Sequence, residues 1–323
     1  MIARLKQRIP AQRGHILDRL MVWSVALLVF AVGAFALYYY LDQQGGGGVD
    51  SIDRRIATFE TAVRENPDSV SARAALAELY FAKTRYAEAV EQYQVALDLD
   101  GENNSILVGL GRALLATGDH RAAAEKFQKA IDLASDAGLM TEVAETAYYY
   151  LGSISLTENQ PDEAIAHLKQ ALAIEPTDAD AWYLLGVASI EADDIDGAIE
   201  ALTQAVMFVP NYAEAYEKLV VAYEGKGLEA EARYASGMLA YSQGRYDEAV
   251  SELEAAIAAS PELASAHVGL GLARESLSQR EAAVAAYQRA LEIEPENFGA
   301  RSWLSRLGAT LPQEYGAAEG VTP

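Results

Sequence analysis

The sequence contains no cysteine and only four histidines, and these two shortages exclude or disfavour several kinds of site. Without cysteine the chain has no disulfide, no thiolate metal site and no cysteine nucleophile. The histidines are far apart in sequence and none forms a His-Glu-x-x-His pair; they are His15, His120, His167 and His267. The sequence therefore predicts neither a metal site nor a cofactor.

Motifs of the common enzyme classes are missing as well. The chain has no GxxxxGK[ST] phosphate loop, no GxSxG nucleophile elbow and no DxDxDG calcium loop. Gly109-Leu110-Gly111 and Gly269-Leu270-Gly271 resemble the start of a dinucleotide loop, but each lies within a helix-like pattern and lacks the third glycine. We therefore predict that the protein is not an enzyme.

Positive charge is scarce everywhere except at the N-terminus. The net charge is −22, yet residues 1–20 hold five basic residues against Asp18 alone, which leaves −26 on the remainder once this local +4 is set aside. Such a surface repels nucleic acid and anionic lipid headgroups. It indicates either a solvated acidic surface or a basic partner, and no nucleic-acid ligand.

One long apolar run stands out, at residues 20–41, and it contains no charge. A helix of this length spans roughly 33 Å, enough to cross a ~30 Å hydrocarbon core. Trp23 lies near one end and Tyr38–Tyr40 near the other, as in aromatic belts, and the basic residues precede the run. We predict a single-pass anchor with residues 1–19 in the cytoplasm and the rest outside it.

A cleaved signal peptide is the competing interpretation, because Ala34-Phe35-Ala36 resembles a small-residue cleavage site. The apolar run, however, continues to Leu41, beyond the ~7–15 residues typical of a signal sequence. Residues 42–52 follow, with four consecutive glycines at 45–48 that cannot hold a helix. This segment is predicted to be a flexible linker.

Beyond the linker, glycine and alanine recur with a fixed spacing. Each of five glycines is followed by alanine at the twelfth and the nineteenth residue further on. The glycines are Gly111, Gly152, Gly186, Gly237 and Gly271, and two of the intervals between them are 34 residues. A period of this size indicates a stack of similar supersecondary units, which favours binding over catalysis.

Within each unit the apolar residues recur at intervals of three and four, as in amphipathic helices. A turn such as Thr117-Gly118-Asp119 divides the unit, and a proline such as Pro176 or Pro210 ends it before a capping Asn or Asp. Each unit is therefore predicted to be a helical hairpin.

These units resemble the tetratricopeptide repeat (TPR) family. The clearest match has Trp182, Leu185 and Gly186 in its first helix, then Ala198, Leu202 and Ala205 in the second, and Pro210 at the end. The resemblance covers residues 53–308 and implies an all-α, right-handed solenoid of about six repeats after the transmembrane helix. Residues 298–308 are predicted to form a cap helix and 309–323 a flexible tail.

The repeat register is broken in three places. Residues 53–66 match only a second helix, and seven extra residues fall around 134–141. Gly237 comes too early for a full unit, which leaves a helix near 213–225 without a second helix of its own. Either this helix is unpaired and twists or hinges the array, or residues 228–243 pack in place of the missing helix.

The TPR resemblance implies that the concave face of the first helices binds an extended peptide or a helix. Side chains at those positions offer aromatic and apolar contact area with acidic neighbours, so we expect an apolar or aromatic partner with basic flanks. The candidate peptide-binding residues are Phe81, Leu115, Tyr149, Tyr183, Tyr234, Met238 and Tyr241. Each could equally pack as core between hairpins.

Two functions follow from this arrangement. In the first, the protein is a membrane-anchored scaffold or adaptor that binds another protein. Its layout is similar to that of bacterial membrane-anchored TPR proteins in envelope assembly, secretion or complex biogenesis. In the second, it is a structural accessory subunit held in a larger membrane complex by residues 20–41.

Overall fold

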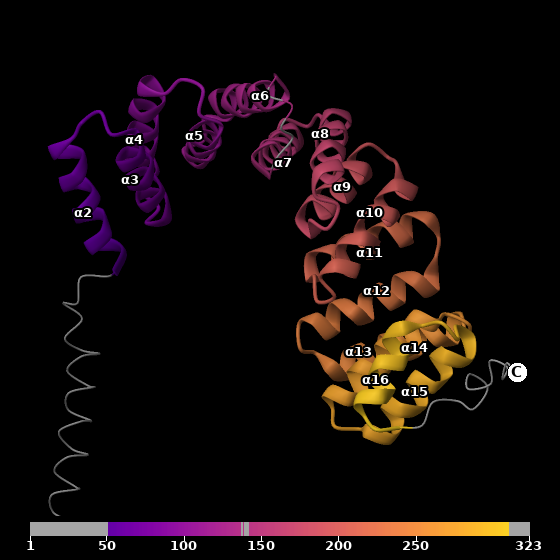
Figure 1. The fold of residues 1–323 in the computed structure, drawn as a ribbon. Helices are drawn as coiled ribbons and strands as arrows, with labels where there is room; N and C mark the ends of the chain where they lie inside the picture. The colour runs from indigo at the N-terminus through magenta and orange to yellow at the C-terminus, as the bar shows by residue number, and fades with distance from the viewer. Residues whose placement is uncertain (1–50, 137, 139–141, 310–323) are drawn as a thin grey trace, which may run out of the picture. The chain divides into compact units, whose positions relative to one another are not determined.

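The computed structural model describes residues 51–136, 138 and 142–309 (Figure 1). The predicted cytoplasmic segment, transmembrane helix and most of the linker lie outside these residues, as do residues 310–323 of the predicted tail. None of the helices in the described part is long and apolar enough to cross a membrane. The chain divides into two compact units at Pro67 and Asp68.

Every regular element in the described residues is an α-helix. The first unit contributes α2 (Ser51–Glu65). The second contains, in chain order, α3 (Val70–Ala82), α4 (Tyr86–Leu99), α5 (Asn104–Ala116), α6 (His120–Asp136), α7 (Glu142–Thr157), α8 (Pro161–Ile174), α9 (Ala179–Glu191), α10 (Ile195–Phe208), α11 (Ala213–Lys226), α12 (Glu229–Ser242), α13 (Tyr246–Ala259), α14 (Ala264–Ser276), α15 (Arg280–Ile293) and α16 (Phe298–Arg306).

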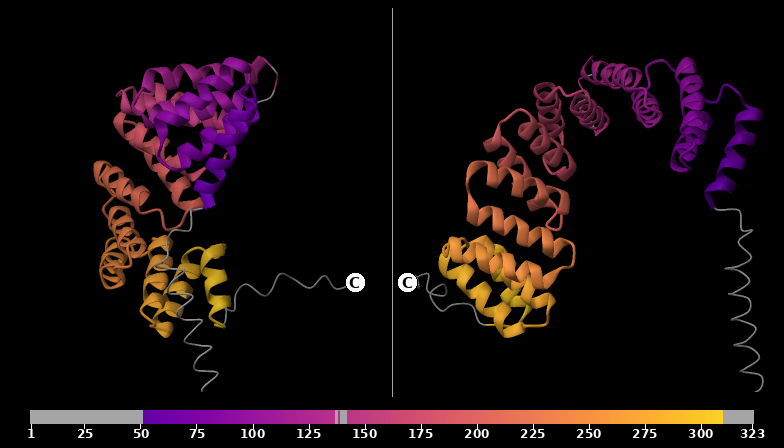
Figure 2. Two further views of the ribbon diagram at one scale, coloured as in Figure 1. Left: turned by 90° about the vertical axis from the view of Figure 1, so that its left-hand side faces the viewer. Right: turned by 180° about the vertical axis from the view of Figure 1, so that it is seen from behind.

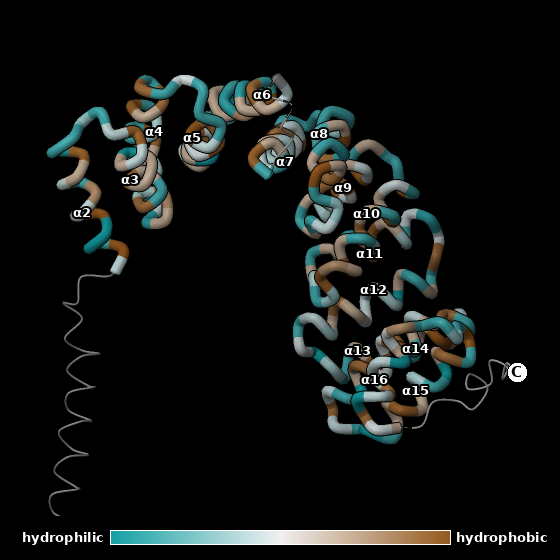
Figure 3. Tube along the Cα trace, in the orientation of Figure 1, coloured by the Kyte–Doolittle hydropathy of each residue, from teal (hydrophilic) through white to brown (hydrophobic). Residues whose placement is uncertain are grey.

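The second unit is a stack of helical hairpins, as the repeat predicts. Helices α3 and α4 pair with each other, α5 packs on α4 and pairs with α6, and the pattern continues to α15 (Figures 1 and 2). Apolar and polar residues are interspersed along the helices (Figure 3), and the buried apolar side chains pack between neighbouring helices. The last helix, α16, covers the end of the stack with Leu304 buried against Tyr287 and Ala290.

The hairpins are closed by a repeated turn that needs a left-handed residue. Thr84, Gly118, Asn159, Asp193, Gly227, Gly244 and Ser278 all have positive φ at equivalent positions. In each turn the residue that follows donates its N–H to a carbonyl of the last helical turn, for example Leu228 to Tyr223 at 2.9 Å. Glycine, and to a lesser degree asparagine and aspartate, tolerate this conformation, whereas the β-branched Thr84 adopts it at an energetic cost.

Close packing within the hairpins explains the glycine period. A Cβ added to Gly186 would lie 2.5 Å from Cγ of Leu202, and one added to Gly152 would lie 2.6 Å from Cγ of Leu168. Both leucines are fully buried. The large residue sixteen positions after each glycine therefore lies directly on the first helix, and only glycine leaves room for it.

The seven extra residues around 134–141 lengthen two helices. Helix α6 has 17 residues against 14 in the other second helices, and α7 has 16 against 13 in most first helices. Ala134 is 1% exposed, so the added part of α6 still contributes to the core. Residues 137 and 139–141 of this segment lie outside the described part of the chain.

Of the two interpretations left open for the helix near 213–225, the structure supports the second, in which residues 228–243 pack in place of the missing helix. Helix α12 packs against both α11 and α13. The turn at Gly227 has the same left-handed geometry as Gly244, so α12 is the second helix of one hairpin and the first helix of the next. The register therefore slips by half a repeat because one helix serves two hairpins.

The shared helix requires an exchange of large and small residues. Position 220, which is 34 residues after Gly186, is Val220 instead of glycine, and sixteen residues further on stands Ser236 instead of a large residue. The large residue of this packing pair is therefore in the first helix, α11, and the small residue is in the second helix, α12. Around it, α10, α11 and α12 share one core that includes Leu202, Leu219 and Met238.

Candidate peptide-binding face

A cluster of tyrosines and carboxylates lies where α7, α9 and the start of α11 meet. We call Glu145, Tyr149, Asp180, Tyr183 and Tyr212 the tyrosine face. The Tyr212 hydroxyl donates a hydrogen bond to Asp180 Oδ1 at 2.7 Å. The rings of Tyr183 and Tyr212 lie 5.1 Å apart with an interplanar angle of 36°. Tyr212 thus joins α11 to α9 and fixes the ring of Tyr183.

The local sequence explains why these side chains are presented together. Asp178 caps α9 by accepting hydrogen bonds from the backbone N–H of Asp180 and Ala181 at 2.9 and 3.2 Å. This cap fixes the first turn of α9. In that turn Asp180 is exposed and Ala181 is buried. Tyr183 follows three residues after Asp180 and therefore lies on the same side of the helix.

A cavity of ≈ 280 Å³ opens at one end of the tyrosine face. Its lining combines aromatic rings with carboxylates and a hydroxyl, from Glu145, Thr146, Tyr149, Tyr150, Asp178 and Asp180. The rings of Tyr149 and Tyr150 meet edge to face with their centroids 5.3 Å apart. Such a pocket suits a cationic side chain, because both a carboxylate and an aromatic ring face attract cations.

The field around this cavity is negative. Burial, and then Asp180 and Asp178, raise the pKa of Tyr149 to about 12. Burial together with Glu214 and Glu217 also raises the pKa of Tyr183. Between residues 130 and 217 the sequence holds 17 Asp and Glu against a single Lys169. Bringing a positive group to this face would therefore be favourable.

Glu145 is the most perturbed carboxyl group of the face. Burial above all, together with the nearby Asp178 and Glu175, raises its pKa to about 7, against the opposing effect of a hydrogen bond with the Thr146 hydroxyl. A carboxyl whose folded-state pKa lies above its ordinary 4.5 binds more protons in the folded state. Ionisation of Glu145 therefore destabilises the folded protein. This destabilisation is absent below about pH 4.5 and complete above about pH 7.

Replacing Glu145 with glutamine should thus stabilise the protein only at the higher pH. We expect no change in the free energy of unfolding at pH 4.5 and a gain of about 1 kcal/mol at pH 7.5, after discounting for the solvent exposure of the side chain. Thermal unfolding of the variant and the wild type at the two pH values measures this. Glu191→Gln, at an exposed position on α9, is the control. An equal gain at both pH values would contradict the prediction.

The structure brings together some of the predicted binding residues and places others in the core. Tyr149 and Tyr183 belong to the tyrosine face. Tyr234 packs against the core shared by α10, α11 and α12, with its ring 6.5 Å from that of Tyr216. Met238, only 5% exposed, is part of the same core. These two residues therefore provide packing between hairpins.

The remaining predicted residues lie elsewhere along the first helices. Phe81 packs edge to face on Tyr86, and the Arg112 guanidinium lies over its ring at 4.6 Å from the centroid. Leu115 is half-buried on α5. Tyr241 is half-buried, and its ring lies 5.6 Å from that of Tyr246. Tyr241 packs against the same core that Tyr183 and Tyr212 border.

Sequence reasoning missed Glu145, Asp180 and Tyr212. Tyr212 lies in the loop after α10, beyond the helix positions from which binding residues are counted. Its contact with Asp180 spans 32 residues of sequence, close to one repeat period. The signal that could have found it is this spacing, since residues one period apart lie side by side in a stack of repeats.

Comparison with known proteins decides the family. Tetratricopeptide repeat matches cover residues 155–236 and, in a second set, 56–104, 86–138, 108–178, 213–264 and 234–298. The chain belongs to the tetratricopeptide repeat family. TPR solenoids are protein-binding scaffolds, and the tyrosine face is a surface of that scaffold.

Individual relatives and solved structures are similar to this chain over part of their length or at low sequence identity. The chain is 32% identical to the general transcriptional corepressor trfA of Dictyostelium discoideum over 77 residues, which is 23% of this chain and 6% of that protein. Among solved structures, it is similar to the C-terminal part of a TPR protein from Cytophaga hutchinsonii, with 17% identity, a TM-score of 0.50, and coverage of 84% of this chain and 99% of the other. It also resembles MamA, with 28% identity, a TM-score of 0.46, and coverage of 55% and 95%.

Proposed function

We propose that this protein is a membrane-anchored TPR adaptor that captures a partner polypeptide on its tyrosine face. The observation that carries the proposal is the cluster of Tyr149, Tyr183 and Tyr212 with Asp180 beside a ≈ 280 Å³ cavity. Tyrosine contributes a large contact area with few rotatable bonds, as at protein interfaces generally.

The partner segment that this face suits is apolar or aromatic, with lysine or arginine beside it. Aromatic side chains stack on the tyrosine rings, while a cationic side chain enters the cavity beside Glu145, Asp178 and Asp180. Exposed Glu214 and Glu217 extend the negative potential along α11. The aromatic contacts provide affinity and the carboxylates favour a basic partner over an acidic one.

Anchoring through residues 20–41 is supported by the uncharged, 22-residue apolar run and the basic residues that precede it. In this arrangement the solenoid lies outside the cytoplasm, tethered by a glycine-rich linker, where it would act in envelope assembly, secretion or the biogenesis of a complex. A protease added to intact spheroplasts is expected to digest the solenoid. Digestion only after the membrane is opened would overturn this orientation.

The capture experiment changes two residues of the tyrosine face, Tyr149 on α7 and Tyr183 on α9. Crosslinking pull-down of the full-length anchored protein is expected to lose its main partner when Tyr149 and Tyr183 are changed to alanine. Tyr148→Ala is the matched control, because Tyr148 lies next to Tyr149 in sequence but faces His167 of α8, 6.2 Å from that ring. An unchanged partner set in the double variant would reject the tyrosine face as the binding site.

An accessory subunit held by its membrane segment is the second candidate function, favoured by the same apolar run. Exchanging residues 20–41 for an unrelated transmembrane sequence separates the two candidates. Capture that survives the exchange assigns binding to the solenoid. Capture that is lost on the exchange, but kept in the tyrosine variants, assigns binding to the membrane segment.

A further inference from the structure

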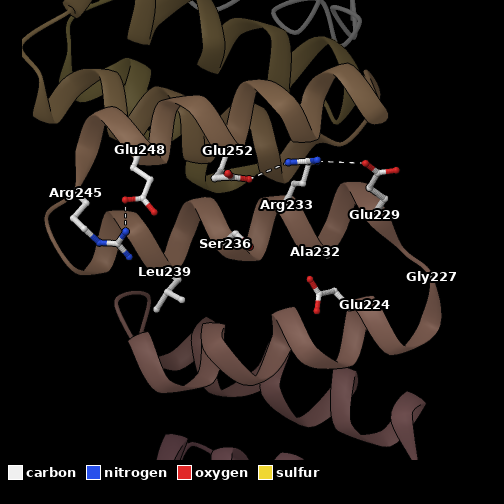
Figure 4. Close-up of a pocket in the computed structure, with 10 residues that line it drawn as sticks. All are labelled: Glu224, Gly227, Glu229, Ala232, Arg233, Ser236, Leu239, Arg245, Glu248 and Glu252. Carbon is white, nitrogen blue, oxygen red and sulfur yellow. Dashed lines mark hydrogen bonds and ion pairs between the residues drawn. The ribbon is translucent and has the colours of Figure 1, made fainter.

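A groove runs over α12 at the half-repeat slip, and nothing in the proposed function uses it. It encloses ≈ 590 Å³, within the range of ligand-binding cavities. Helix α12 forms its floor, and α11 and α13 form its walls (Figure 4). We call it the α12 groove, defined by Glu224, Glu229, Arg233, Ser236, Glu248 and Glu252, together with the apolar floor residues Ala232 and Leu239.

A regular hairpin of the same chain contains an equivalent but smaller groove. It lies over α9 between α8 and α10, encloses ≈ 430 Å³, and we call it the α9 groove. Equivalent positions in the two grooves are 51 residues apart, which is one and a half repeat periods. The pairs are Trp182 and Arg233, Leu185 and Ser236, Gly197 and Glu248, and Ala201 and Glu252.

The two grooves differ in the size of their floor residues and in the charge of their walls, where Arg245 also takes the place of Asp194. In the α9 groove Trp182 and Leu185 fill space over the floor, whereas Ser236 leaves it open in the α12 groove. Small residues on the wall of the α9 groove are replaced by Glu248 and Glu252. The slip has therefore produced a wider groove with carboxylates along its rim.

The carboxylates outnumber the basic groups. Arg233 is held between Glu229 at 3.4 Å and Glu252 at 3.3 Å, and Arg245 pairs with Glu248. Two guanidinium groups thus face four carboxylates. The fourth, Glu224, points from α11 toward Ala232 on the floor (Figure 4). A cation placed between Glu224 and Glu229 would add an ion pair without displacing an existing one.

We propose that the α12 groove binds a cationic amphipathic helix of a partner protein. A face of alanine and leucine on that helix would lie on Ala232, Ser236 and Leu239, in the space that Ser236 leaves where the α9 groove has Leu185. Lysine or arginine on its flanks would meet Glu224 and Glu229 on one side and Glu252 on the other. This site is separate from the tyrosine face and does not depend on the proposed function.

The test measures binding of a fluorescent helical probe with the repeat Lys-Ala-Ala-Leu to the full-length protein in nanodiscs, by anisotropy at low salt. Glu224→Lys, at an exposed position, is expected to weaken binding about tenfold. The same probe interrupted by two prolines should bind at least tenfold more weakly, because it cannot form the helix.

The matched control is Glu200→Lys, an exposed change of the same charge on the rim of the α9 groove. Binding that falls equally in Glu200→Lys and Glu224→Lys would overturn the site, because it would report only the net charge of the protein. Equal binding of the proline-interrupted probe would overturn the helical partner. A third outcome is that the probe does not bind, while the protein associates with itself and Glu224→Lys abolishes this association. That result would assign the groove to a second copy of the chain instead.

Discussion

Replacing Gly271 with alanine is expected to lower the stability of the C-terminal hairpins by about 2 kcal/mol. Alanine is favoured over glycine in a helix by about 1 kcal/mol, which alone would stabilise the protein. The added methyl group, however, would lie 2.6 Å from Cδ1 of Tyr287, a fully buried and rigid ring. Overpacking of this kind costs typically 1–3 kcal/mol, and the surrounding hairpins leave the ring no room to move.

Gly225 provides the contrast within the same protein. It lies in α11 with open space where a Cβ would be placed, so Gly225→Ala should stabilise the protein by up to about 1 kcal/mol. Chemical denaturation of both variants measures the two effects. In a Tyr287→Ala background, Gly271→Ala should no longer destabilise, because the clash is removed. A stabilising Gly271→Ala in the wild-type background would contradict the packing explanation of the repeat period.

Reversing the charge of Glu214 and Glu217 to lysine is expected to weaken binding of a basic, aromatic peptide to the tyrosine face about a hundredfold, or ~3 kcal/mol. Both side chains are exposed, so the fold should tolerate the change. The effect is large because the reversal replaces attraction by repulsion at two positions. Raising the salt concentration should weaken wild-type binding and reduce the difference.

The control for this reversal keeps the total charge the same. Glu91→Lys with Glu125→Lys changes exposed positions on the second helices α4 and α6, away from the tyrosine face. Titration of one synthetic peptide into each protein in nanodiscs gives the affinities. If the control pair weakens binding as much as the Glu214 and Glu217 pair, the negative potential of the whole surface, and not this face, attracts the peptide.

The helical hairpins and their packing could be predicted from the sequence because both depend on local rules. The period of 34 residues, the Gly–Leu packing pair such as Gly186 and Leu202, and the turn residues all repeat along the chain. Each repeat contacts mainly its neighbours, so the pattern in the sequence is also the pattern of contacts. The cap helix was predictable for the same reason.

The pairing of α12 could not be decided in this way. The sequence indicated that the register fails between Ala213 and Gln243, but its local patterns fit either an unpaired helix or a shared one. The choice rests on whether the exchange of bulk between Val220 and Ser236 lets α12 pack on both sides. That is a property of three helices in contact, and no single segment contains it.

The candidate binding face was also predictable from the sequence only in part. The sequence alone determined an acidic repeat protein with aromatic residues on its first helices, because charge and periodicity are properties of the chain. The tertiary structure decided that Tyr183 joins Tyr212 and Asp180, whereas Met238 is buried in the core. Residues of both groups occupy similar positions in their repeats. Only the contacts between neighbouring hairpins determine which side chain is covered and which is left for a partner.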